Sequence, residues 1–236
     1  MTTNRVHRVL HRGLPRTGKF AAALAIMALV GAFGAGSGVA GNADPSSCTV
    51  STATSQPFLS FGDQDSYFLA PGGSFEGSPG KALNGWSTTG RVAISKNNES
   101  YYVGSSSDSQ SLFMAAGSSA TTPPICVAID TPALRVFVQS NGASNSSLQV
   151  VLNYTDKNGN PQSATVASLS GGTSWSLSPH VRFLSNIAPI VGGQGQTSVS
   201  FSFVPVGGAN WQIDDLYIDP IKSQGSDGWG GWGGCC

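Results

Sequence analysis

Two adjacent carboxylates, Asp214 and Asp215, stand out in the last apolar segment of this 236-residue chain, WQIDDLYIDP. The alternation of this segment predicts a β-strand that ends at the proline. Regular alternation would place Ile213, Asp215 and Tyr217 on one face, so at least one carboxylate of the pair should point inward. A buried carboxylate needs a cation or several hydrogen-bond donors, and the best upstream partner for such a site is Glu76.

Residue types that support catalysis are scarce. Beyond the first 40 residues the only histidine is His180, which excludes a histidine-rich metal centre, and no Gly-x-Ser-x-Gly motif supports a serine nucleophile. A glycosidase needs two carboxylates that flank a cleft, but the spacing of Glu76 and Glu99, with Asp108 and Asp130 as possible partners, indicates no such pair. We therefore expect a protein that is not an enzyme. A hydrolase would be revealed by activity lost on changing Glu99 or Asp130.

Aromatic and amide side chains in the middle of the chain suit sugar recognition. Flat rings stack on the apolar face of a sugar, and amides hydrogen-bond to its hydroxyl groups. The candidate ligand-binding residues are Tyr101, Tyr102, Trp175, Asn98 and Gln139. The alternative is that these aromatic rings pack in the core or along its edge.

The four cysteines fall at separate places in the chain. Cys48 precedes the main domain and Cys126 follows a Pro-Pro turn, whereas Cys235 and Cys236 are the last two residues. In an exported protein we expect a disulfide between Cys48 and Cys126, although four cysteines allow three connectivities.

Residues 1–40 are typical of a secretory signal peptide. Five basic residues precede an apolar run at 20–33 that is short for a membrane span, and small residues allow cleavage after Ala40. Cleavage after Ala43 and an uncleaved anchor are the alternatives. The mature chain would keep seven of the twelve basic residues and all twelve acidic ones. Such an acidic surface gives no footprint for nucleic acid, so we expect a secreted or cell-surface protein with no stable membrane insertion after cleavage.

Turn residues and short apolar runs alternate through the rest of the chain. This pattern predicts strands at 73–76, 86–95, 101–103, 111–115, 125–129, 134–139, 148–154, 163–168, 181–185, 197–204 and 212–218. Gly, Ser and Pro interrupt every apolar run, so only a poor helix candidate remains. The sequence predicts an all-β sandwich at 71–220, preceded by an extension at 41–70 that packs on the domain edge.

Four motifs follow one another along the chain: GSFE at 73–76, GW at 85–86, SQSL at 109–112 and WQIDDLYI at 211–218. Together they resemble galactose-binding-like jelly-roll β-sandwiches and are similar to the carbohydrate-binding modules of secreted glycoside hydrolases. The resemblance implies a structural calcium ion held by Glu76 and by Asp214 or Asp215, and hard oxygen ligands of this kind suit Ca²⁺. The alternative is that the two aspartates accept backbone or arginine hydrogen bonds without a metal.

The glycine-rich tail at 221–236 contains Trp229, Trp232, Cys235 and Cys236. Its composition predicts flexibility, with possible roles in an aromatic contact or in disulfide-linked tethering or self-association. The sequence thus favours a secreted, non-catalytic protein that binds a polysaccharide or cell-surface glycan. The alternative is a structural or adhesive surface protein without sugar binding, multimerised or tethered through this tail.

Overall fold

The computed structural model describes residues 48–143, 145–191 and 195–219. The predicted signal peptide, the first residues of the extension and the tail with Trp229, Trp232, Cys235 and Cys236 lie outside the described residues. Within the described ranges, no helix has the length and apolar character needed to cross a membrane.

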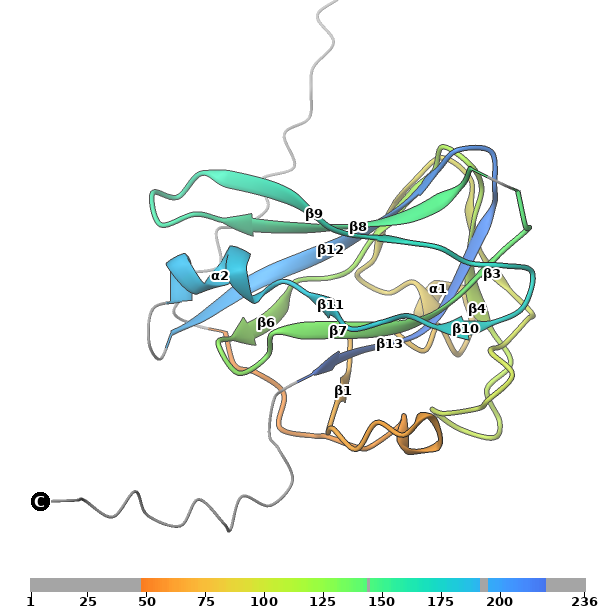
Figure 1. Ribbon diagram of the computed structural model, residues 1–236, viewed down its shortest axis with the longest axis horizontal. Helices are drawn as coiled ribbons and strands as arrows, with labels where there is room; N and C mark the ends of the chain where they lie inside the picture. Colours follow the sequence, from red (N-terminus) through yellow and green to blue (C-terminus); the bar gives the residue numbers. More distant parts are fainter. Residues whose placement is uncertain (1–47, 144, 192–194, 220–236) are drawn as a thin grey trace, which may run out of the picture. The chain divides into compact units, whose positions relative to one another are not determined.

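Two antiparallel sheets form the layers of a sandwich (Figure 1). One has seven strands in the order β10-β7-β13-β4-β3, with β1 beside β13 and β11 beside β7; the other has six in the order β2-β5-β12-β8-β9, with β6 beside β12. The strands are β1 (Phe68–Leu69), β2 (Ser87–Thr89), β3 (Val92–Ser95), β4 (Ser111–Met114), β5 (Ser119–Thr121), β6 (Ile125–Ala128), β7 (Ala133–Ser140), β8 (Ser147–Thr155), β9 (Pro161–Leu169), β10 (Ser176–Leu177), β11 (Val181–Arg182), β12 (Gln196–Val206) and β13 (Trp211–Asp219). Three short helical segments accompany them: η2 (Leu59–Phe61), α1 (Pro79–Ala82) and α2 (Leu184–Val191). The expected all-β sandwich is confirmed.

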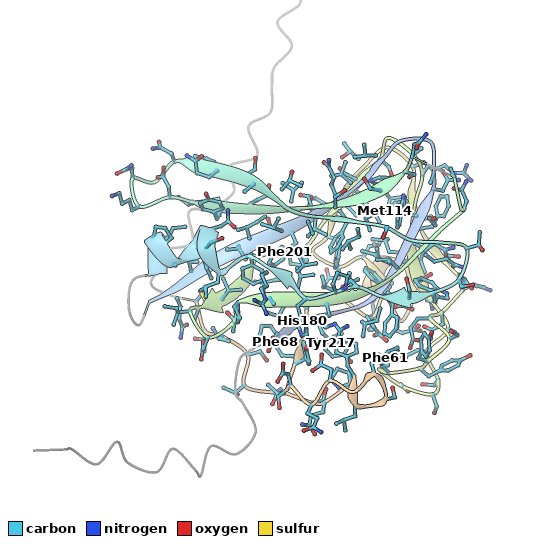
Figure 2. All side chains as sticks on the ribbon, viewed as in Figure 1. Phe61, Phe68, Met114, His180, Phe201 and Tyr217 are labelled. Carbon is cyan, nitrogen blue, oxygen red and sulfur yellow. A yellow bond between two sulfur atoms is a disulfide. The ribbon has the colours of Figure 1, made fainter. Side chains whose placement is uncertain are left out.

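The main core lies between the two sheets and follows the period-two alternation of the long strands. In β7, Leu134, Val136 and Val138 point inward, and in β12 Phe201 and Phe203 meet them from the other sheet. Each of these side chains is almost fully buried, which stabilises the fold by about 1.5–3 kcal/mol per residue. In Figure 2, Phe201 lies between the layers, whereas Phe61 lies on the outer side of the seven-stranded sheet.

A second apolar cluster, the outer cluster, covers part of the outer face of the seven-stranded sheet. It consists of Phe58, Tyr67, Phe137, Trp175 and Tyr217. Phe58 and Tyr67 come from the segment 48–67, and the ring of Phe58 lies 4.9 Å from that of Tyr67 and 5.5 Å from that of Tyr217. This segment, drawn in orange in Figure 1, therefore packs across part of the outer face of the sheet.

The expected disulfide between Cys48 and Cys126 is present. It joins the start of the extension to β6, across 78 residues of chain. The strands predicted at 148–154 and 163–168 form as β8 and β9 and pair as a hairpin, in whose turn the carboxylate of Asp156 accepts hydrogen bonds from the backbone of Asn158 and Asn160.

The strands predicted at 73–76 and 101–103 are absent from the described structure, so these two predictions are wrong. Phe75 and Tyr102 adopt φ angles of 55° and 53°, a left-handed conformation that a strand does not accommodate. The segment predicted as one strand at 86–95 forms β2 and β3, which belong to different sheets. The segment predicted as a strand at 181–185 divides into β11 and the start of α2.

A β-bulge in β13 overturns the predicted alternation around the acidic pair. Pairing with β7 is regular up to Asp214 and resumes at Tyr217 with one extra residue on β13. Asp215 stands at this bulge with a φ of 48°. Because the extra residue shifts the register, Ile213 faces the main core while Tyr217 faces the outer cluster. The prediction that Ile213, Asp215 and Tyr217 share one face is therefore wrong.

Candidate functional site

Five carboxylates gather at the place where β4 separates from β13. The β13–β4 pairing ends at Ile213, and β1 takes over at Tyr217, so the bulge lies between the two neighbouring strands. The loops at 70–78 and 96–110 reach into this gap. Together these segments supply the acidic cluster: Glu76, Glu99, Asp108, Asp214 and Asp215.

Asp215 is the least compensated member of the acidic cluster. Its side chain is 1% exposed, and neither carboxylate oxygen has a hydrogen-bond partner. A Cβ placed on Gly104 would lie 2.6 Å from Oδ2 of Asp108 and 3.0 Å from Oδ1 of Asp215, so these two carboxylates converge on the same backbone position. Burial, followed by the charges of Glu99 and Asp108, raises the pKa of Asp215 to about 7.

Asp214 and Glu99 are held by backbone amides. Oδ2 of Asp214 accepts the N–H of Glu99 at 3.0 Å, and Oδ1 accepts the N–H of Asp215 at 2.9 Å. The fully buried carboxylate of Glu99 accepts the N–H groups of Tyr101 and Val103. Burial and then the Asp215 charge raise the pKa of Asp214 to about 9, and burial raises the pKa of Glu99.

Glu76 anchors the other side of the acidic cluster. Its Oε1 accepts the N–H groups of Ser109 and Gln110, both at 2.7 Å. Burial, and then the charge of Glu76, raises the pKa of Asp108. Among the described residues, no lysine or arginine forms an ion pair with any of the five carboxylates. The acidic cluster is therefore a concentration of negative charge without a basic partner among the described residues.

The predicted calcium ligands Glu76, Asp214 and Asp215 lie in the same region of the fold, where the charge of Glu76 is the smallest of the influences on Asp215; calcium binding by them stays a prediction. The bulge distinguishes the two aspartates: Asp214 is bonded by backbone amides, whereas Asp215 faces Asp108 across Gly104. Sequence reasoning weighed Asp108 only as a partner in a glycosidase pair and missed its place beside Asp215, although it directly precedes the SQSL motif.

The uncovered part of the seven-stranded sheet presents a row of amide side chains, the amide row: Asn97, Gln139 and Gln212. Gln139 of β7 and Gln212 of β13 are register partners. Nδ2 of Asn97 donates to Oε1 of both, at 3.0 and 3.1 Å, and the hydroxyl of Ser111 donates to Oε1 of Gln212 at 3.1 Å. These bonds fix the amides in place while all three remain partly exposed.

An open cavity of about 290 Å³ borders the amide row. It is lined by Phe113, Gln139, Ser140, Asn141, Thr173, Asn210, Trp211 and Gln212. The cavity thus combines the partly exposed ring of Phe113 with several amides and hydroxyls, a lining that suits a polar ligand with one apolar face.

The two predicted tyrosines are at the protein surface. Tyr101 and Tyr102 are 49% and 51% exposed. The ring of Tyr101 stacks on Phe137 at 5.4 Å and meets Phe61 edge-on at 4.8 Å. Phe137 and Gln139 are two residues apart on the outer face of β7, so Tyr101 lies on the same face of the sheet as the amide row.

Trp175 and Asn98 occupy other roles among the predicted ligand-binding residues. Trp175 is 8% exposed and packs in the outer cluster, which corresponds to the packing alternative. Nδ2 of Asn98 donates to the carbonyl of the next residue, Glu99, at 2.8 Å. Gln212, Ser111 and Phe113 were missed, although Gln212 stands two residues before Asp214 on the outward face of its strand.

A separate polar network ties the extension to the sheet through Asp63. Its carboxylate accepts hydrogen bonds from the hydroxyl of Tyr67 and from Nη1 of Arg135, both at 2.6 Å, and from the N–H of Asp65 at 3.0 Å. Burial alone would raise the pKa of Asp63, but these bonds outweigh it and lower the pKa. Near the same network, Asp219 ends β13 with 4% exposure, and burial followed by the charges of Asp65 and Asp63 raises its pKa to about 6.

No protein-family model and no curated protein sequence matches this chain. Similar solved structures include the C-terminal family 22 carbohydrate-binding module of Clostridium thermocellum Xyn10B (17% identity, 63% of this chain, 92% of that chain, TM-score 0.41). Another is the CBM22-1 xylan-binding domain of Paenibacillus barcinonensis Xyn10C (16% identity, 64% of this chain, 92% of that chain, TM-score 0.38). A third is TmCBM61 in complex with β-1,4-galactotriose (18% identity, 57% of this chain, 88% of that chain, TM-score 0.34). These proteins are of the class that the sequence motifs resemble. Identities below 20% and TM-scores near 0.4 assign no ligand to this chain.

Proposed function

We propose that this protein is a secreted, non-catalytic carbohydrate-binding module that uses the open part of its seven-stranded sheet. The observation that carries the proposal is the amide row, held in place by its own hydrogen bonds and lying on the same face of the sheet as exposed aromatic rings. A sugar ring needs this combination, because its hydroxyl groups require directional donors and acceptors while its C–H face stacks on an aromatic surface. Export agrees with the disulfide, since such bonds persist in oxidising compartments.

The proposed recognition surface has two parts. Gln139 and Gln212 provide side-chain amides on neighbouring strands, and Asn97 links them. Tyr101 provides an exposed ring on the same face of the sheet. Because the amides are already fixed, binding would cost less side-chain entropy than it does for free glutamine side chains.

We further propose that the acidic cluster holds one structural calcium ion. Asp108 and Asp215 converge on the backbone of Gly104, both oxygens of Asp215 are buried without a partner, and Glu76 is bonded to the backbone that directly follows Asp108. Oxygen ligands without a nearby nitrogen or sulfur donor suit Ca²⁺. When bound, the ion would supply the positive charge that these carboxylates lack and would tie the loops at 70–78 and 96–110 to β13.

The experiment is affinity electrophoresis of the exported protein in gels that contain soluble xylan, galactan, glucan or mannan. We expect retardation by at least one polymer. Gln212→Ala should raise the dissociation constant about tenfold, which corresponds to a loss of about 1.4 kcal/mol of binding free energy. Tyr101→Ala should raise it at least as much. Asn158→Ala, in the exposed β8–β9 turn, is the matched control.

Two outcomes would reject this assignment. Absence of retardation on every polymer by the folded, calcium-supplied protein would favour a structural or adhesive surface protein. Retardation that is unchanged by both Gln212→Ala and Tyr101→Ala would place the sugar site elsewhere on the molecule.

A further inference from the structure

Arg91 is a basic residue at the edge of the proposed sugar site. It stands directly before β3, the edge strand of the seven-stranded sheet, and its side chain is exposed. Within the described ranges its guanidinium group takes part in no ion pair. By contrast, Arg135 on β7 is bonded to Asp63 and to the carbonyl of Ser178. Of these two arginines, Arg91 is the one available to a ligand.

The side chain of Arg91 is held over the ring of Phe113. Its guanidinium carbon lies 5.7 Å from the ring centroid, which is within the range of a cation–π contact. Phe113 in turn lines the cavity of about 290 Å³ together with Gln139 and Gln212. The ring therefore positions the guanidinium group at the border of that cavity. Because the group is already positioned, less side-chain entropy is lost when it binds an anion.

The residues next to Arg91 form one row across four neighbouring strands, β3, β4, β13 and β7 (Figure 1). Ala93 of β3 is the register partner of Phe113 in β4, and Phe113 is the register partner of Gln212 in β13. Gln212 pairs in turn with Gln139 of β7. At a strand spacing of about 4.8 Å, this row is about 14 Å wide. A glycan that lies along the row would meet amides at the β7 end and the guanidinium group at the β3 end.

The charge of the exported chain makes a local cation necessary for any anionic ligand. Beyond residue 40 the sequence has seven basic and twelve acidic residues, so the protein as a whole repels a polyanion. The described residues that line the cavity are all uncharged, so the amides by themselves give no preference for a charged sugar. Arg91 is therefore the group that can make such a preference.

We propose that Arg91 binds a carboxylate of the glycan, so that the polymer held by the amide row carries uronic acid residues. This inference rests on the proposed carbohydrate-binding function and names the class of glycan. A planar guanidinium group matches a carboxylate through two parallel N–H···O bonds. Sulfate esters carry the same charge on a tetrahedral group, so the experiment compares both kinds of anionic substituent.

The test is affinity electrophoresis of the exported protein in gels that contain a glucuronic-acid-bearing xylan or arabinogalactan, each compared with its own carboxyl-reduced form. We expect at least one acidic polymer to bind about tenfold more tightly than its reduced form. Arg91→Gln should raise the dissociation constant of the acidic form about tenfold and change that of the reduced form less than twofold. Arg91→Lys keeps the charge but loses the planar fork, so it should lower the preference about threefold. Gln212→Ala should weaken both forms alike, which separates damage to the sugar site from loss of the anion contact.

Lys157→Gln, which removes one positive charge from the exposed β8–β9 turn, is the matched control and should keep the preference of the parent. A sulfated galactan that binds through Arg91 as tightly as the acidic polymers would overturn the assignment to carboxylates. Equal binding of the acidic and reduced forms, or a preference that survives Arg91→Gln, would overturn this inference and leave the proposed function standing. Absence of retardation by every polymer, acidic or neutral, would reject the function and this inference together.

Discussion

Removal of calcium should make the stability of this domain fall as the pH rises. The reason is Asp215, which is 1% exposed and whose pKa in the folded protein is about 7, against an ordinary value of 3.8. Below pH 4 the carboxyl group is protonated in both the folded and the unfolded chain. Between pH 4 and 7 it ionises in the unfolded chain first, so the unfolded state binds fewer protons and the folded state loses stability.

The size of this effect follows from the pKa difference. A rise from 3.8 to about 7 is roughly 3 pH units, which at 1.36 kcal/mol per unit amounts to about 4 kcal/mol at most. For a domain of this size that corresponds to roughly 8–16 °C in melting temperature. Calcium reverses the trend, because it binds the ionised carboxylates and stabilises the folded state more as the pH rises.

Thermal melts of decalcified and calcium-supplied protein between about pH 4.5 and 8 would measure this difference. Asp215→Asn should melt higher than the parent when both are decalcified near pH 8, and calcium should add little to it. Asp130→Asn should follow the parent under all conditions. The reasoning fails if the decalcified parent is equally stable at both ends of the pH range, or if Asp215→Asn gains as much from calcium as the parent does.

Three further changes test other contacts. Gly104→Ala places a Cβ 3.0 Å from Oδ1 of Asp215, so calcium affinity in a fluorescence or calorimetric titration should fall at least tenfold; unchanged affinity would exclude this position from the metal site. Asp63→Asn removes a charge-assisted bond of 2.6 Å to Arg135, a side chain only 13% exposed. It should lower the free energy of unfolding, measured in urea, by about 2–4 kcal/mol. A loss below about 1 kcal/mol would show that packing of the extension does not depend on this ion pair. Reduction of the disulfide that spans 78 residues should lower the free energy of unfolding by about 4 kcal/mol, and equal urea midpoints with and without reductant would contradict this.

The sheets could be predicted from the sequence because their signal is local. The runs at 134–139 and 197–204 alternate with period two, and β7 and β12 form there with alternate apolar residues facing the main core: Leu134, Val136 and Val138 in β7, and Val199, Phe201 and Phe203 in β12. The hairpin of β8 and β9 has its own turn residues. These features depend on neighbours in the chain, and the prediction needed no knowledge of the partner strands.

The acidic cluster could be predicted only in part, because distant segments assemble it. A regular strand would have left Asp214 and Asp215 equivalent, and the bulge that separates them arises where β13 changes partner from β4 to β1. Glu99 looked like an isolated glutamate, but its carboxylate is bonded by amides of its own loop. The left-handed φ of Tyr102 belongs to that loop, which is why an expected strand fails there.

The 96–110 loop belongs to both proposed sites, and this links them physically. Asn97 at its start bonds the two glutamines of the amide row, and Tyr101 lies on the same face of the sheet as that row. A few residues later, Gly104 and Asp108 meet Asp215 in the acidic cluster. An ion that fixes Asp108 and Asp215 would therefore restrict the backbone that carries Tyr101, and a more ordered loop loses less entropy when a glycan binds. Glycan affinity that weakens on calcium removal would indicate that the ion orders this loop, whereas affinity independent of calcium would indicate that the amide bonds of Glu99 hold the loop by themselves.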